Sequence, residues 1–169
     1  ESIKQKRGKE WDKFEEANEG KTILKPSDWD ESIAISDSVM RSHSKFFTGG
    51  TPEVSYWKRH EIYTNLILKA RLDYEHADLA IDLKTSANAK PEKFSKTAVD
   101  IGYHIQDCLY RYVTEKPEFV FIAVDKEQPY CVAGPLMFDE LARRFASLLC
   151  EKAYGELSES FDMDYWPGY

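Results

Sequence analysis

Six consecutive apolar residues, Phe119 to Val124, constrain the fold of this chain more than any other feature. A strand with one face in water alternates apolar and polar residues, whereas an unbroken apolar run is typical of a strand covered on both faces. A second strand is predicted at 79–85, and helical patterns occupy 91–112 and 138–154. This order of elements predicts an α/β sandwich around a central mixed sheet.

The first fifty residues have helical rather than strand-like patterns. A surface helix is predicted to end at Gly20, and Ser27 is expected to cap a second helix. Strand-like sequences follow at 54–57 and 62–74, joined by a hairpin turn, with a shorter strand candidate at 130–133. We expect one domain over 1–169, made of a helical N-terminal part (1–50), a part with the sheet and long helix (51–135), and a C-terminal helix and tail (136–169).

Composition excludes several classes of function. The net charge of −7 has the wrong sign for a protein that coats nucleic acid, so any DNA contact must use a local basic surface. Cys108, Cys131 and Cys150 include no CxxC pair, which argues against a disulfide framework and against a zinc or iron–sulfur site. We interpret them as buried reduced thiols. No apolar run approaches the roughly 18 residues of a membrane span.

Asp82 and Lys84 are the first candidates for chemistry. Residues i and i+2 of a strand point to the same face, so these two side chains project together. Asp82 can ligate a hard cation, and Lys84 can orient or deprotonate a water and meet a phosphate. The alternative is a surface ion pair, because an Asp-x-Lys triplet occurs by chance in roughly half of chains this long. Burial between Ile81 and Leu83 favours function, since a buried charged pair is costly unless it is paired or binds a metal.

Three further residues can join this pair. Asp73 ends the preceding strand, so hairpin pairing can bring it beside Asp82, and two carboxylates repel unless a cation lies between them. Gln106 and Tyr110 are four residues apart and share one face of the long helix. For Tyr110 alone, ordinary packing is the simpler interpretation, and His104 is more typical of a surface or core histidine than of a ligand.

Four short motifs lie between residues 69 and 121. They are Arg71-Leu72-Asp73 before the hairpin, Asp82-Leu83-Lys84-Thr85-Ser86 in the strand, Tyr-His-x-Gln-Asp-x-x-Tyr from Tyr103 to Tyr110, and Pro-x-Phe-Val-Phe from Pro117 to Phe121. Together they resemble the PD-(D/E)XK nuclease superfamily, and within it the RecE-type (exonuclease VIII) phage recombination exonucleases. The resemblance covers most of the chain and is weakest after Tyr130. It implies an α/β fold with a PD-(D/E)XK nuclease-like central mixed β-sheet flanked by helices.

The resemblance also implies roles for individual residues. Asp73, Asp82 and the carbonyl of Leu83 would ligate Mg²⁺, which Mn²⁺ could replace, and Glu53 stands where related members often carry an acid. Lys84 would be the catalytic lysine, with Gln106 and Tyr110 lining the site. The family usually has an upstream Gly-x-x-x-His helix whose histidine joins the metal. Nothing before Gly8 supplies it and His43 has the wrong context, so we expect the chain to lack that first helix.

The activity that the resemblance implies is Mg²⁺-dependent 5′-to-3′ degradation of one strand of linear double-stranded DNA, which leaves a 3′ single-stranded tail for recombination. The implied partners are DNA ends, a single-strand annealing protein of the RecT type and further copies of the chain in a ring-like trimer or tetramer. The implied location is cytoplasmic, in a bacterium or encoded by a phage or prophage. The alternative is a non-catalytic DNA-end-binding or assembly module that keeps the nuclease fold. The bases expected to contact DNA are Lys58, Arg59, Arg71, Lys90, Lys93 and Lys96, although a solvated helix face also explains Lys93 and Lys96.

Overall fold

The computed structural model describes residues 7–168 and divides into two compact units, one up to Ala34 and one from Ile35 onward. In the first unit, α1 (Lys9–Ala17) ends before Gly20 as predicted. The helix α2 (Pro26–His43) begins one residue before the expected cap. The Ser27 hydroxyl donates to Asp28 inside the first turn, so the prediction that Ser27 is the N-cap is wrong. A proline is well suited to the first helical position because its backbone angle is already helical and it has no N–H to leave unpaired.

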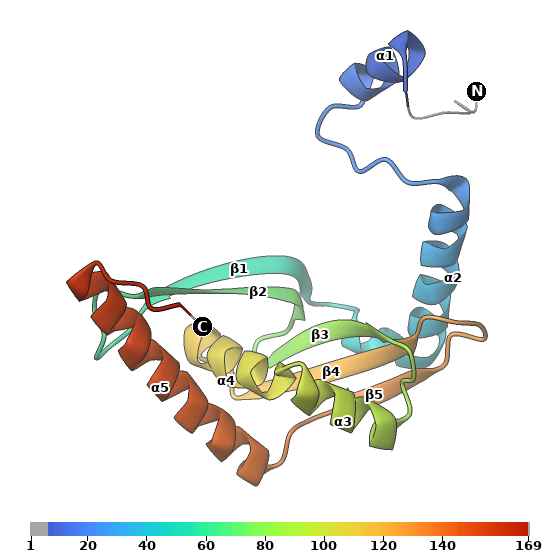
Figure 1. The fold of residues 1–169 in the computed structure, drawn as a ribbon. Helices are drawn as coiled ribbons and strands as arrows, with labels where there is room; N and C mark the ends of the chain where they lie inside the picture. The colour runs from blue at the N-terminus through green and yellow to red at the C-terminus, as the bar shows by residue number, and fades with distance from the viewer. Residues whose placement is uncertain (1–6, 169) are drawn as a thin grey trace. The chain divides into compact units, whose positions relative to one another are not determined.

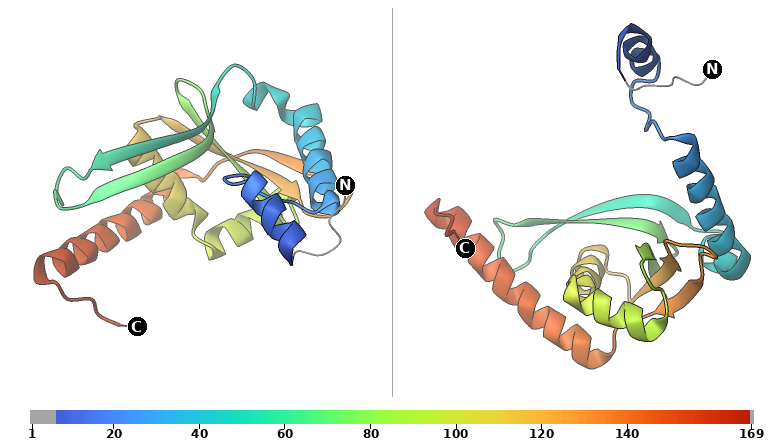
Figure 2. Two further views of the ribbon diagram at one scale, coloured as in Figure 1. Left: turned by 90° about the horizontal axis from the view of Figure 1, so that it is seen from above. Right: turned by 45° about the vertical axis from the view of Figure 1, so that its right-hand side comes forward.

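The second unit is built on a five-stranded mixed sheet with the order β1-β2-β3-β4-β5 (Figures 1 and 2). Only β3 and β4 are parallel, and the connection between them contains α3 and α4. A final helix, α5, packs along α4, and a short 3₁₀ turn at Ser44–Phe46 precedes the sheet. The bounds are β1 Thr51–Arg59, β2 Ile67–Glu75, β3 Leu79–Ser86, α3 Pro91–Asp100, α4 Tyr103–Thr114, β4 Glu118–Asp125, β5 Val132–Leu136 and α5 Glu140–Met163.

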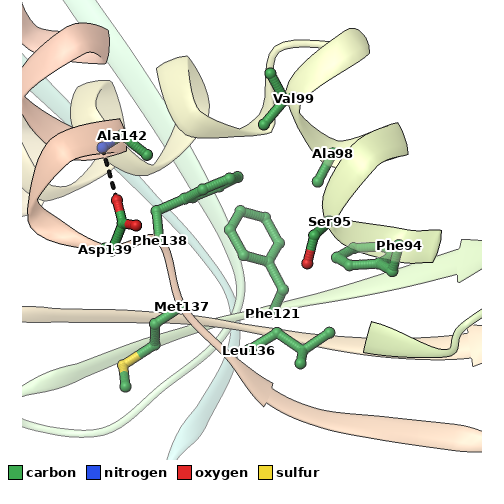
Figure 3. A pocket seen from close by; sticks show the side chains of 10 residues that line it. All are labelled: Phe94, Ser95, Ala98, Val99, Phe121, Leu136, Met137, Phe138, Asp139 and Ala142. Atoms are coloured by element: carbon green, nitrogen blue, oxygen red, sulfur yellow. Dashed lines mark hydrogen bonds between the residues drawn. The ribbon is translucent and has the colours of Figure 1, made fainter. Parts of the chain in front are cut away.

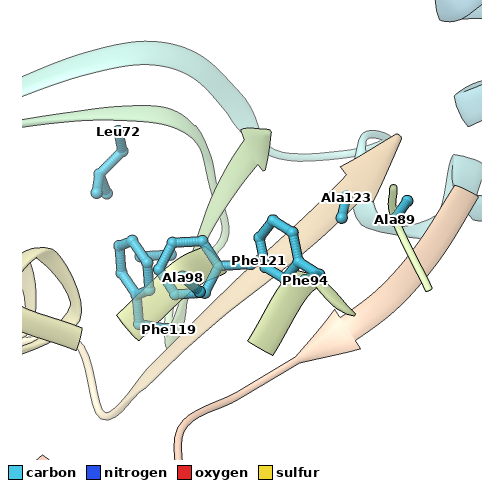
Figure 4. Close-up of a cluster of buried hydrophobic side chains, with 8 residues drawn as sticks. Leu72, Ala89, Phe94, Ala98, Phe119, Phe121 and Ala123 are labelled. Carbon is cyan, nitrogen blue, oxygen red and sulfur yellow. The ribbon is translucent and has the colours of Figure 1, made fainter. Parts of the chain in front are cut away.

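The strand β4 is buried on both faces, as its unbroken apolar sequence predicts. On the helix side, Phe119 and Phe121 pack with Leu72, Phe94 and other side chains in the principal core (Figure 4). On the opposite side, Val120 and Ile122 form a second cluster with β3 and with residues next to the 3₁₀ turn. This central position of β4 fixes β3, its parallel neighbour, as the buried strand that carries Asp82.

The single long helix predicted for 91–112 is in fact two helices. Gly102 adopts a left-handed backbone conformation, φ +82°, and separates α3 from α4. Glycine reaches this conformation without the steric cost that a side chain brings. Ile101 at the break and Ile105 in the first turn of α4 are therefore exposed, while Phe94 and Ala98 stay in the core. The new helix direction brings Gln106 toward β3.

Smaller predictions also change. The strand predicted at 130–133 is found at Val132–Leu136, and β1 continues to Arg59 before the turn. All three cysteines are free thiols, but Cys131 is exposed, so the expectation that all are buried is wrong for this residue. Within residues 7–168, none of the helices is long and apolar enough to cross a membrane.

Candidate active site

The β2–β3 hairpin brings the two predicted carboxylates together. The strands pair through Tyr74 with Ile81 and Glu75 with Ala80, so continuing this register sets Asp73 against Asp82. There the half-buried Asp73 carboxylate takes the place of a backbone partner and accepts the Leu83 N–H at 2.8 Å. Asp73 thus holds β3 through its side chain, where the strands begin to separate.

Asp82 lies at the centre of the site, with 2% of its surface exposed. One oxygen accepts a hydrogen bond from the Gln106 amide at 2.7 Å, and the other is 2.5 Å from the Lys84 ammonium. Burial raises the pKa of the Asp82 carboxyl above its ordinary value, Lys84 opposes that rise, and the negative charge of Asp73 adds to it. A buried acid beside a second acid favours a bound cation.

The donor set at this point fits a magnesium ion. The N–H and C=O of one strand residue point to the same edge of the strand, so the Leu83 carbonyl faces the same gap as Asp73. Mg²⁺ takes oxygen ligands and is usually held by one or two carboxylates, with waters completing the octahedron. Among residues 7–168 no group of three His, Cys, Asp or Glu side chains could hold a metal, so Asp73, Asp82 and Leu83 form a minimal set.

Glu53 and Tyr110 are placed differently from the other predicted site residues. The β1–β2 register sets Glu53 opposite Asp73, but its carboxylate binds the Arg71 guanidinium at 2.8 and 2.5 Å, and both side chains are exposed. Tyr110 packs edge-on against Phe119, with ring centroids 5.8 Å apart, at the margin of the core. The structure therefore places Gln106 against Asp82, whereas Tyr110 packs against the core. His43 is also occupied elsewhere, because its ring bonds the Gly134 carbonyl.

The predicted DNA-contact bases do not form one surface. Lys58 and Arg59 lie at the far end of β1 from Glu53, where Lys58 pairs with Glu115 and Glu61, and Arg59 donates to the Thr64 carbonyl. Arg71 lies next to the site but is paired with Glu53. The remaining three lysines are exposed around the first turns of α3, namely Lys90, Lys93 and Lys96.

Sequence reasoning did not predict two features of the structure, one inside the site and one outside it. The Lys84 ammonium lies 4.5 Å from the ring centroid of Tyr103, which stacks on Phe121 and so holds the lysine between an aromatic face and Asp82. Tyr103 begins the most specific motif, so its presence there was the available signal. The other feature is an apolar cavity of about 280 Å³ between α3 and the start of α5 (Figure 3). Its walls include Phe94, Val99 and Phe138, and it contains none of the acidic site residues.

Comparison with known proteins identifies a family and a similar fold. Residues 7–154 match the family model described as a PDDEXK-like domain of unknown function (DUF3799). The chain belongs to this family. No curated protein matches the sequence. The fold is similar to a crystal structure named as a "putative exonuclease" from Eubacterium rectale, with a TM-score of 0.64 and 18% sequence identity, over 89% of this chain and 62% of that one.

The fold prediction is therefore confirmed at the level of the PD-(D/E)XK superfamily, while the RecE-type resemblance stays a prediction. The assignment of Asp73 as the separate acid, and of Asp82 and Lys84 as the acid-x-lysine pair, stays a prediction. The superfamily generally uses divalent metals, in keeping with the donor set described above. The chain spans 62% of the length of the Eubacterium rectale protein, so the activity of that longer protein does not transfer with the fold.

Proposed function

We propose that this domain is a divalent-metal-dependent deoxyribonuclease, and specifically an exonuclease that degrades one strand of linear duplex DNA 5′-to-3′ and leaves a 3′ single-stranded tail. One observation carries the proposal: the buried Asp82 holds Lys84 and Gln106 on its two oxygens, with Asp73 beside it. Placing a second acid beside the buried Asp82 costs stability unless a cation joins the two carboxylates.

Each residue has a distinct role in phosphodiester hydrolysis. Asp73, Asp82 and the Leu83 carbonyl would hold Mg²⁺, which when bound would supply a Lewis acid for the phosphoryl group. The Lys84 ammonium donates hydrogen bonds to the negatively charged phosphate and orients the attacking water, because charge placed where the transition state develops it is worth most. Gln106 fixes the orientation of the Asp82 carboxylate, and Tyr103 restricts the position of Lys84.

The test is cleavage of linear and circular duplex DNA labelled at the 5′ or 3′ end, with Mg²⁺ or with a chelator. We expect Mg²⁺-dependent loss of the 5′ label from linear DNA and no cleavage of covalently closed circles. Asp82→Asn should abolish this activity, while Asp78→Asn, at an exposed acid in the β2–β3 turn, should not. Cleavage of the circles would make the enzyme an endonuclease. Tight binding of DNA ends without cleavage would favour the alternative, an end-binding module.

A further inference from the structure

The outer face of the β1–β2 hairpin exposes an aromatic side chain among bases. On each strand, alternate residues turn toward α4 and are buried or half-buried, for example Tyr56 and Ala70. The other residues point away from α4, and they include Trp57, which is 63% exposed. Three of them are basic against one acid, although the whole chain has a net charge of −7. This outer face consists of Glu53, Ser55, Trp57, Arg59, Ile67, Lys69 and Arg71.

The register places the aromatic ring and the bases side by side. Trp57 is directly opposite Lys69, whose ammonium lies 5.4 Å from the ring centroid. Next along the hairpin, Ser55 is opposite Arg71, and Arg71 binds Glu53. Asp73 follows Arg71 by two residues on the same strand. The outer face therefore leads directly to the proposed metal ligands.

We propose that the outer face binds a single DNA strand, with an unpaired base stacked on Trp57 and phosphates bound by Lys69 and Arg71. This inference rests on the proposed function for the direction of the strand, but the binding itself does not require cleavage. Non-specific single-strand sites combine a basic track with exposed aromatic rings, because every base offers a flat face to stack on. Residues two apart on a strand are about 7 Å apart, comparable to successive phosphates of an extended single strand.

The position of Trp57 on the hairpin sets its distance from the proposed metal ligands. Four residues separate the register position of Trp57 and Lys69 from that of Glu53 and Asp73, which is about 14 Å along the strand. A base stacked on Trp57 would therefore lie about two nucleotides from the scissile phosphate. A duplex covers its internal bases by stacking, so the outer face should prefer a strand that is already separated.

The experiment measures binding and cleavage separately on the full chain. A fluorescently labelled oligothymidine is titrated with protein in a chelator, and its anisotropy gives the affinity. Trp57→Ala should weaken binding about ten- to a hundredfold, and Trp57→Phe, which keeps a stacking face, should weaken it less. Trp29→Ala removes a comparably exposed tryptophan from α2, outside this face, and should leave the affinity unchanged. Lys69→Gln should lower the salt slope by about 0.7, the value for one phosphate contact on a single strand.

Each outcome decides the proposal independently of the nuclease activity. If the wild-type chain binds oligothymidine through Trp57 but cleaves no DNA with Mg²⁺, the outer face is confirmed and the proposed function fails. If the chain cleaves DNA while Trp57→Ala binds oligothymidine as tightly as the wild type, the nuclease stands and the outer face is not a DNA site. A variant that changes only the sedimentation of the protein, and not its DNA affinity, would overturn the proposal by showing a protein–protein surface.

Discussion

Among residues 7–168 two aspartates are almost completely buried, and they differ in what their ion pairs connect. Asp82 and Asp107 expose 2% and 1% of their surface, and burial is the main cause that raises the pKa of each. Asp107, on α4, binds Arg143 of α5 at 3.0 Å, so its ion pair joins two helices through residues that are 36 positions apart. Asp82 pairs with Lys84, two residues away on the same strand.

The comparison separates a structural charge from a functional one. An ion pair between two elements contributes to tertiary structure, which offsets the desolvation of its groups. The ion pair between Asp82 and Lys84 lies within one strand, so only the uncharged partners Gln106 and Tyr103 connect these two charges to α4. Two arginines, Arg143 and Arg111, lower the pKa of Asp107 against the smaller opposing effect of Glu118, whereas the nearest charges to Asp82 are one lysine, Lys84, and one acid, Asp73. Burial alone therefore does not mark the site.

The largest effect is expected for Lys84→Met, which tests whether the ion pair of Asp82 is functional rather than structural. Removing the ammonium should reduce DNA cleavage about a hundred- to a thousandfold, the usual effect of losing one transition-state charge contact. Single-turnover cleavage with saturating protein measures the chemical step, and DNA affinity should be largely retained. Lys126→Met, at an exposed lysine after β4, is the matched control. If Lys84→Met lost affinity but cleaved bound DNA normally, Lys84 would be only a phosphate contact.

The opposite pattern is expected for Arg143→Met. Loss of the guanidinium leaves Asp107 buried without its main partner, which should lower the free energy of unfolding by about 3 kcal/mol. The folded protein should cleave DNA at the normal rate. Urea denaturation measures the first effect, and Arg144→Met, the exposed neighbour, should leave stability near the wild-type value. If Arg143→Met and Arg144→Met were equally stable, the ion pair between Asp107 and Arg143 would not stabilise the fold.

A smaller effect is expected in the pH dependence of stability. The pKa of Asp107 in the folded protein is raised above the ordinary 3.8 by burial, although Arg143 opposes the shift. Between the unfolded and folded pKa values the folded state binds more protons, so this carboxyl makes the protein less stable as the pH rises from about 4 through its raised pKa. Asp107→Asn should lack this slope. Urea unfolding of both proteins from about pH 4 to neutral pH gives the difference in slope. Parallel curves of unfolding free energy against pH would contradict the raised pKa.

The smallest effect is expected for Tyr110→Phe. The ring packs on Phe119, and phenylalanine preserves that contact, so turnover should stay close to the wild-type value. Gln106→Leu, one turn away, removes the hydrogen bond that orients Asp82 and should lower turnover about tenfold, within the range for orienting groups around a ligand. Comparing the two single-turnover rates checks this order. If Tyr110→Phe lost more turnover than Gln106→Leu, the Tyr110 hydroxyl would have a role in the site.

The sequence predicts the parts of this site that are close in the chain. The apolar run of β4 and the hairpin between Asp73 and Asp82 are local patterns, and both are found in the structure. Asp107 and Arg143 are 36 residues apart, and no local pattern shows that α4 and α5 lie together. The helix break at Gly102 was missed because a stripe with helical spacing continues across it. A single left-handed residue changes the direction of the helix without changing that spacing.

The hydrogen bond from the Leu83 N–H to Asp73 has a consequence for how this domain can change over generations. Asp73 completes the strand pairing as well as supplying a carboxylate, so selection for folding preserves it even where cleavage is no longer needed. Lys84 contributes less to the fold, because its ion pair lies within one strand and its contact with α4 is with the Tyr103 ring alone. In a descendant that lost its chemistry, the lysine would therefore be free to drift first. The presence of both residues in this chain is what a retained cleavage activity would require.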